Sequence, residues 1–155
     1  MKKPMLFIPA VIAVAGVLTA ASAPQKAPHK QLIKPKGSEA LQLPFSPGLL
    51  VGDTLYLSGV IGNDASGQPA AGGFEAEIRQ AFANAQAVLK GADMDFADVV
   101  AVTVFLADIK DFPQMNTIYK EYFKTEPLPT RSTVAVKDLV RGAKIEITMT
   151  AVRAK

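Results

Sequence analysis

The sequence predicts an α+β fold, a two-layer sandwich in which two helices cover one face of an antiparallel or mixed sheet. Three observations support this prediction. Several segments have strand-like patterns, two longer segments repeat their apolar residues every three or four positions, and the elements follow one another in the order β-β-α-β-α-β-β. At 155 residues, the chain has room for one such domain.

The first two strands form a predicted hairpin over residues 49–61, LLVGDTLYLSGVI. Apolar residues flank Gly52 and Asp53, and glycine can adopt the positive φ that a tight turn requires. The next segment, NDASGQPAAGG at residues 63–73, is small, polar and rich in glycine. It therefore predicts a loop.

Two amphipathic helices are predicted. The first runs over residues 74–90 and ends at Gly91, and its apolar residues recur at helical spacing: Phe74, Ile78, Phe82, Ala85 and Leu89. The second begins with the sequence DFPQ at residues 111–114, which is typical of a capping box with proline in the first turn. We expect this helix to run to about Phe123.

Three further strands are predicted from β-branched residues and period-two alternation: DVVAVTVFLAD at 98–108, STVAV at 132–136 and KIEITMTAV at 144–152. The sheet face that the helices leave uncovered carries apolar residues of its own. In a chain of this size, we expect that face to be buried against other copies of the protein.

The first 23 residues have the three parts of a secretory signal: two lysines, an apolar run and an end rich in small residues. We therefore expect a signal peptide over 1–23 and a periplasmic or secreted protein. The alternative is an uncleaved membrane anchor, because the stretch from Met5 to Ala23 is nearly long enough to span a bilayer. Residues 24–40 are basic and rich in proline and predict a disordered linker. The folded domain is predicted to span 41–155.

The charge of the folded part argues against a nucleic-acid partner. Six of the 17 basic residues and one of the 14 acidic residues precede residue 41, which leaves 11 basic and 13 acidic residues in the domain. A slightly acidic domain does not suit the phosphate backbone.

Several chemistries are excluded by composition. The chain has no cysteine, and its single histidine, His29, lies in the predicted linker, so Ser-His and Cys-His mechanisms are unavailable. The domain offers no cluster of metal ligands and no glycine-rich phosphate loop. Any chemistry must use arginine, carboxylates, hydroxyls, amides and backbone groups.

Arg131 and Glu146 stand among apolar and β-branched residues, in two runs that we expect to lie on adjacent strands. Two interpretations are open. They can form a surface ion pair on the sheet, worth about 0–1 kcal/mol. Alternatively they form a site, because arginine binds a carboxylate with two hydrogen bonds and a nearby glutamate can activate a water.

Three segments resemble the reactive intermediate deaminase family, also called RidA or YjgF. They are the hairpin VGDTLYLSG, the segment VTVFLADIKDFPQMNTIYKEYF and the phrase LPTRSTVAV followed by GAKIEI. The likeness spans residues 43–153. It implies the chorismate-mutase-like RidA fold and a homotrimer in which each pocket lies between neighbouring subunits.

The resemblance also implies roles for individual residues. The arginine that clamps the substrate carboxylate in the family matches Arg131, and the glutamate that orients the catalytic water matches Glu146. The serine and glycine that line the pocket match Ser58 and Gly59, and the asparagine of the second helix matches Asn116.

Two positions depart from the family pattern. Where deaminases often have a tyrosine after a proline, this chain has Phe45, which lacks the hydroxyl. Where a cysteine often stands two residues after the arginine, this chain has Thr133, which keeps a small polar group.

The implied activity is hydrolytic deamination of 2-imino acids to 2-keto acids and ammonia, without a cofactor and without a metal. The expected partner is a small imino or keto acid, with no nucleic acid and no membrane contact after removal of the signal. The alternative is a non-catalytic protein that binds a small metabolite in the same pocket. This alternative gains weight because the imines arise from cytoplasmic pyridoxal-phosphate chemistry, whereas the leader predicts export.

Overall fold

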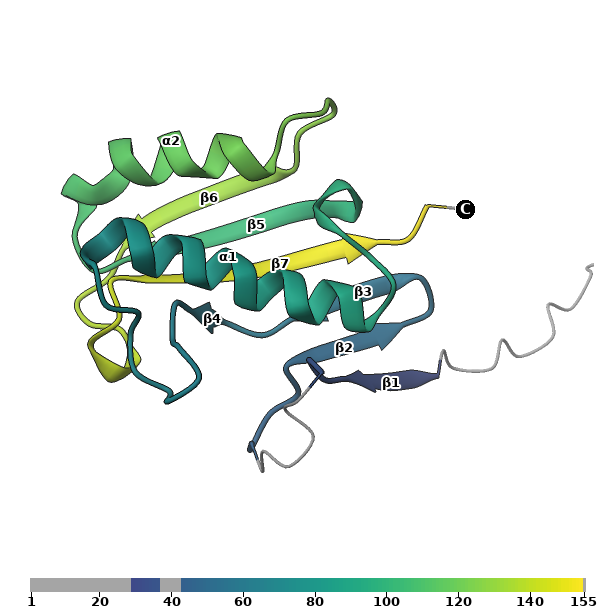
Figure 1. The fold of residues 1–155 in the computed structure, drawn as a ribbon. Helices are drawn as coiled ribbons and strands as arrows, with labels where there is room; N and C mark the ends of the chain where they lie inside the picture. The colour runs from purple at the N-terminus through teal and green to yellow at the C-terminus, as the bar shows by residue number, and fades with distance from the viewer. Residues whose placement is uncertain (1–28, 37–42, 155) are drawn as a thin grey trace, which may run out of the picture.

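The computed structural model describes residues 29–36 and 43–154. One sheet runs through these residues in the order β1-β2-β3-β7-β5-β6, and β4 pairs with β7 beside β3. Two helices, α1 (Gly73–Gly91) and α2 (Phe112–Tyr122), cover one face of this sheet (Figure 1). The strands are β1 (Lys30–Ile33), β2 (Gly48–Val51), β3 (Thr54–Leu57), β4 (Val60–Ile61), β5 (Val99–Leu106), β6 (Thr130–Ala135) and β7 (Ile145–Val152).

The predicted α+β class is confirmed, and the sheet is mixed. β5 and β6 are parallel, whereas every other pair is antiparallel. The predicted hairpin is formed by β2 and β3, and Gly52 supplies the positive φ of the turn at 62°. The predicted signal peptide, 1–23, lies outside the described residues.

The predicted disordered linker over 24–40 is wrong in one part, because Lys30–Ile33 forms β1 at the edge of the sheet. Ile33 is 3% exposed, and it packs beside Gly48 and Gly91, where a Cβ would crowd it. The composition of a segment indicates whether it can fold alone. It does not indicate whether the segment can pair with the open edge of a strand elsewhere in the chain, as these four residues pair with β2.

The second arm of the predicted hairpin is interrupted. β3 ends at Leu57, and after Ser58 and Gly59 the chain continues as β4, which pairs with β7 instead of β2. In this register Val60 lies opposite Ile147, and Ile61 lies opposite Glu146. The interruption therefore brings Ser58 and Gly59 to the end of β7 where Glu146 projects.

The first helix begins and ends as predicted, whereas the start of the second differs. A short 3-10 helix, Ile109–Asp111, precedes α2, and its cap is Asp108, whose carboxylate accepts the N–H of Lys110 at 2.9 Å. Asp111 has helical backbone angles and no side-chain cap bond, so the predicted capping box at 111–114 is wrong. Proline does occupy the first turn of α2.

An aromatic cluster joins the two helices above the sheet. Phe82 of α1 stacks on Tyr122 of α2 with ring centroids 4.0 Å apart. Phe96 meets both of these rings edge-on, and Phe123 meets the ring of Phe82 edge-on. Tyr119 lies 4.5 Å from Phe123. This packing determines which side of α2 faces β6.

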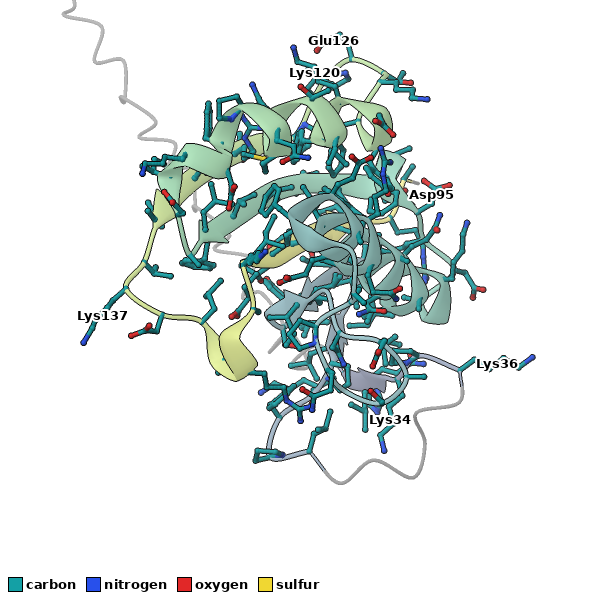
Figure 2. All side chains as sticks on the ribbon, turned by 60° about the vertical axis from the view of Figure 1, so that its left-hand side comes forward. Lys34, Lys36, Asp95, Lys120, Glu126 and Lys137 are labelled. Carbon is teal, nitrogen blue, oxygen red and sulfur yellow. The ribbon has the colours of Figure 1, made fainter. Side chains whose placement is uncertain are left out.

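Several charged side chains lie at the periphery of the domain and point outward, among them Lys36, Asp95, Lys120, Glu126 and Lys137 (Figure 2). Within the described part of the chain, neither helix is long and apolar enough to cross a membrane.

Candidate functional site

Arg131 lies on β6 and points toward α2. Its register partner in β5 is Val102, a buried core residue. The guanidinium carbon of Arg131 lies 4.4 Å from the ring centroid of Tyr119 and 5.9 Å from that of Phe112. Aromatic faces attract a cation at these distances. Two rings of α2 therefore hold Arg131 on the face of the sheet that the helices cover.

Thr133 and Asn116 lie on the same side as Arg131. Thr133 is two residues further along β6, which places it on the same face of the strand. Asn116 precedes Tyr119 by three residues on α2 and shares its face of the helix. We call Asn116, Arg131 and Thr133 the arginine half-site.

Tyr119 is a residue of this region that sequence reasoning missed, although its three-residue spacing from Asn116 was a signal. Its hydroxyl and that of Thr133 are buried and have no hydrogen-bond partner among residues 29–36 and 43–154. Burial raises the pKa of Tyr119 to about 12, and the positive charge of Arg131 opposes part of this shift. The phenol is therefore neutral at physiological pH.

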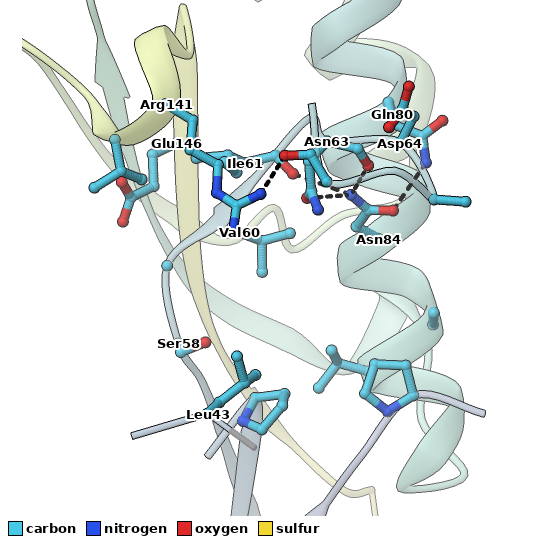
Figure 3. A pocket seen from close by; sticks show the side chains of 18 of the residues that line it. Leu43, Ser58, Val60, Ile61, Asn63, Asp64, Gln80, Asn84, Arg141 and Glu146 are labelled. Carbon is cyan, nitrogen blue, oxygen red and sulfur yellow. Dashed lines mark hydrogen bonds between the residues drawn. The ribbon is translucent and has the colours of Figure 1, made fainter. Parts of the chain in front are cut away.

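Glu146 lies on β7 and points the opposite way. Its neighbours Ile145 and Ile147 are buried against the helices, so the alternation of the strand turns Glu146 to the other face. The close-up of the groove shows its carboxylate directed away from α1 (Figure 3). Phe105 of β5 and Ile61 of β4 flank it in register.

Ser58, Gly59 and Phe45 line the same groove as Glu146. A Cβ at Gly59 would lie 1.8 Å from Oε1 of Glu146, so only glycine allows the carboxylate its observed position. Phe45 is 54% exposed and places an aromatic ring without a hydroxyl at the groove. We call Phe45, Ser58, Gly59 and Glu146 the glutamate half-site.

Arg141 lines the groove and was not predicted from the sequence. It has a left-handed backbone conformation, with φ at 60°, and its guanidinium donates a hydrogen bond to the Gly67 carbonyl. This contact ties the loop at 63–69 to the connection between β6 and β7. Because Gly67 and Arg141 are 74 residues apart, no local pattern indicated their contact.

The expectation that Arg131 and Glu146 lie on adjacent strands is wrong. β5 separates β6 from β7, and the two side chains project from opposite faces of the sheet. They form no ion pair with each other, which removes the interpretation of a structural pair on the sheet. The two half-sites of one chain are thus separated by the sheet itself.

The two half-sites contain a guanidinium, a carboxylate, hydroxyls and an amide. Among residues 29–36 and 43–154, no three histidine, cysteine, aspartate or glutamate side chains gather as metal ligands would. The guanidinium can bind a carboxylate through two hydrogen bonds, and the carboxylate can accept a proton from water.

Comparison with known proteins gives related sequences with a named activity. A human protein named 2-iminobutanoate/2-iminopropanoate deaminase is 46% identical over 111 residues, which cover 71% of this chain and 80% of that protein. A RutC family protein of Aquifex aeolicus is 37% identical over 71% of this chain and 89% of its own length.

Solved structures and a family model point to the same family as these relatives. YyfA of Yersinia pestis, described as a Rid family protein of unknown function, has a TM-score of 0.75 and 33% identity and covers 81% of this chain and 100% of its own. RidA of an Antarctic Psychrobacter has a TM-score of 0.73 and 31% identity, with coverages of 79% and 99%. The family model described as Endoribonuclease L-PSP matches residues 37–153. The chain therefore belongs to the RidA/YjgF family.

Proposed function

We propose that this protein hydrolyses 2-imino acids to 2-keto acids and ammonia. The observation that carries the proposal is the pair of half-sites, one built around a guanidinium held by aromatic rings and the other around a carboxylate held against Gly59. The activity named for the relatives at 41–46% identity supports the same reaction.

In the proposed mechanism, Arg131 binds the substrate carboxylate through two parallel hydrogen bonds. Glu146 takes a proton from water while the water oxygen adds to the carbon of the protonated C=N bond. Glu146 then gives this proton to the amino nitrogen of the carbinolamine. The ionised Glu146 next takes the proton of the carbinolamine hydroxyl while the C–N bond breaks, so that the C=O bond of the keto acid forms and ammonia leaves; the proton on Glu146 is then released to solvent. The protonated imine is already electrophilic, so this sequence of steps uses no cofactor.

We further propose that the active assembly is a homotrimer in which each pocket joins the arginine half-site of one copy to the glutamate half-site of the next. Arg131 and Glu146 of one chain project from opposite faces of its sheet, so two copies are needed to bring both to one ligand. Closed rotational symmetry repeats such a contact at every interface.

Two single variants test the roles of the half-sites. Arg131→Lys keeps the charge and loses the two-point contact, so we expect the affinity for 2-ketobutyrate to fall by about tenfold to a hundredfold. Glu146→Gln keeps the shape and removes the base, so we expect unchanged affinity and lost turnover. Calorimetry and keto-acid release from enzymatically generated 2-iminobutanoate measure these effects. If both variants bind and turn over as the wild type does, Arg131 and Glu146 do not form the substrate site.

Mixing the two variants tests the shared pocket. Each alone is expected to turn over poorly, but refolding them together should restore about a quarter of the wild-type turnover, because random assembly joins the two intact halves at one interface in four. No recovery in mixed assemblies, or a monomer in light scattering, would contradict the intersubunit site. If the wild-type protein binds 2-ketobutyrate but does not turn over the imine, the protein is better described as a metabolite-binding protein. Phe45→Tyr would then be the first substitution to try for restoring activity.

We also propose that the protein is exported and that residues 1–23 are removed. The lysines, apolar run and small residues at the start of the sequence support this. Mass spectrometry of the native protein is expected to find a chain that begins between Ser22 and Pro24. A mass that includes Met1 would favour the membrane anchor.

The description of the family model names an endoribonuclease, but the charge of this chain favours a small carboxylate. With 11 basic and 13 acidic residues from residue 41 onward, the domain lacks the excess of positive charge that binds a phosphate backbone. We expect no retention of single-stranded RNA in a filter-binding assay at physiological salt.

A further inference from the structure

Two polar side chains of α1, Glu77 and Asn84, reach the strands that carry the glutamate half-site. They are seven residues apart and therefore lie on the same side of the helix. Glu77 is 2% exposed and is the only buried charged residue in the described part of the chain. Asn84 lines the groove that also contains Glu146 (Figure 3).

Glu77 holds the beginning of β7. One oxygen of its carboxylate accepts the backbone N–H of Lys144 at 2.5 Å and that of Ile145 at 3.4 Å. Lys144 and Ile145 directly precede Glu146, so these bonds fix the backbone from which the Glu146 side chain projects.

Asn84 holds β4. Its amide nitrogen donates to the carbonyl of Ile61 at 3.0 Å and to the carbonyl of Asn63 at 2.9 Å, and Gln80 donates to its amide oxygen at 2.8 Å. β4 has two residues and few ladder hydrogen bonds of its own. Ile61 is the register partner of Glu146, and the chain enters β4 from Gly59, so Asn84 holds the strand that lies beside Glu146 and follows Gly59.

We propose that Glu77 and Asn84 are positioning residues that, from one side of α1, fix the start of β7 and the strand β4 around Glu146. They thereby set the place of the Glu146 carboxylate against Gly59 and toward the reacting water. This assignment rests on the proposed function, in which Glu146 handles the proton. Neither residue needs to touch the substrate.

Four variants test this assignment, with kcat expressed per 2-ketobutyrate-binding site so that unfolded protein does not count. Asn84→Ala and Glu77→Leu are expected to lower kcat by about tenfold to a hundredfold, since small displacements of a catalytic group cost this much. The affinity for 2-ketobutyrate should stay unchanged, because Arg131 lies on the other face of the sheet. Glu77→Gln keeps an acceptor oxygen and should retain most of the turnover. Gln86→Ala, at an exposed amide on the same helix, is the matched control and should resemble the wild type.

The outcomes separate this assignment from the function on which it rests. If Glu146→Gln keeps wild-type turnover, both the proposed function and the positioning role are overturned. If Glu146→Gln is inactive while Asn84→Ala and Glu77→Leu keep wild-type kcat per site, only the positioning role is overturned. Equal losses of kcat and affinity, or no rescue by Glu77→Gln, would also overturn it, because a positioning residue acts on turnover through its acceptor oxygen.

Discussion

Substituting Gly59 with alanine is expected to separate turnover from stability. A Cβ at this position would lie 1.8 Å from Oε1 of Glu146, and real Cβ contacts are essentially never under 3.0 Å. The carboxylate oxygen must therefore move by at least the difference, 1.2 Å. Displacements of about 1 Å in a catalytic group can reduce rates by about a hundredfold, or about 2.7 kcal/mol in the activation free energy.

The cost to folding should be small. The colliding atom is the end of a flexible side chain, and Gly59 is not among the glycines with positive φ, so alanine adopts its backbone without strain. Replacing glycine also reduces the entropy of the unfolded chain, which stabilises by about 0.4–1 kcal/mol. We expect the free energy of unfolding of Gly59→Ala to stay within about 1 kcal/mol of the wild type.

Gly62→Ala is the contrasting variant. Its Cβ would lie 2.0 Å from the backbone carbonyl oxygen of Glu77, which cannot move without the helix, so we expect a loss of stability of about 1–3 kcal/mol or more. Urea unfolding and keto-acid release from 2-iminobutanoate distinguish the two variants. Gly59→Ala with wild-type kcat, beside an inactive Glu146→Gln, would refute the reasoning that the contact with Gly59 sets the position of the carboxylate.

Three further outcomes are expected. Ile33→Ala should lower the free energy of unfolding by about 2–4 kcal/mol, because Ile33 is 3% exposed, whereas Leu32→Ala, at a side chain 51% exposed, should change it little; equal effects in urea unfolding would contradict the placement of β1. Tyr119→Phe should raise the free energy of unfolding by about 1 kcal/mol, since it keeps the ring under Arg131 and removes a buried hydroxyl that has no hydrogen-bond partner in the described part of the chain. A loss of stability would reveal a partner for the hydroxyl. The folded-state pKa of Tyr119 is raised from 10.0 to about 12, so the unfolded chain releases this proton first and stability should fall as the pH rises from about 10 to about 12. The difference in the free energy of unfolding between wild type and Tyr119→Phe isolates this group. A difference that stays constant across that pH range would contradict the shift.

Local patterns in the sequence predicted both helices, most of the strands and the face that each strand residue occupies. Alternation in KIEITMTAV places Ile145 and Ile147 on one side of β7 and Glu146 on the other, and helical spacing placed Phe82 in the core. These patterns are local, since a strand repeats every two residues and a helix every 3.6. The motifs around Arg131 and Glu146 likewise indicated the family.

Which strands are neighbours, and where side chains from distant segments meet, became known only from the three-dimensional structure. β6 and β7 are consecutive in the chain but not paired, because β6 runs parallel to β5 on the side away from β7. Arg131 is the register partner of Val102 and Glu146 that of Phe105, so the two side chains lie on opposite faces of the sheet. Local patterns also did not predict β1, the interruption between β3 and β4 at Gly59, or the hydrogen bonds of Glu77 and Asn84. Each depends on contacts between residues 15 or more positions apart in the chain, such as Asn84 with Ile61 at a separation of 23 and Glu77 with Lys144 at 67. Periodicity indicates which side of a helix or strand is buried, whereas the element that packs against that side depends on the packing of the whole domain.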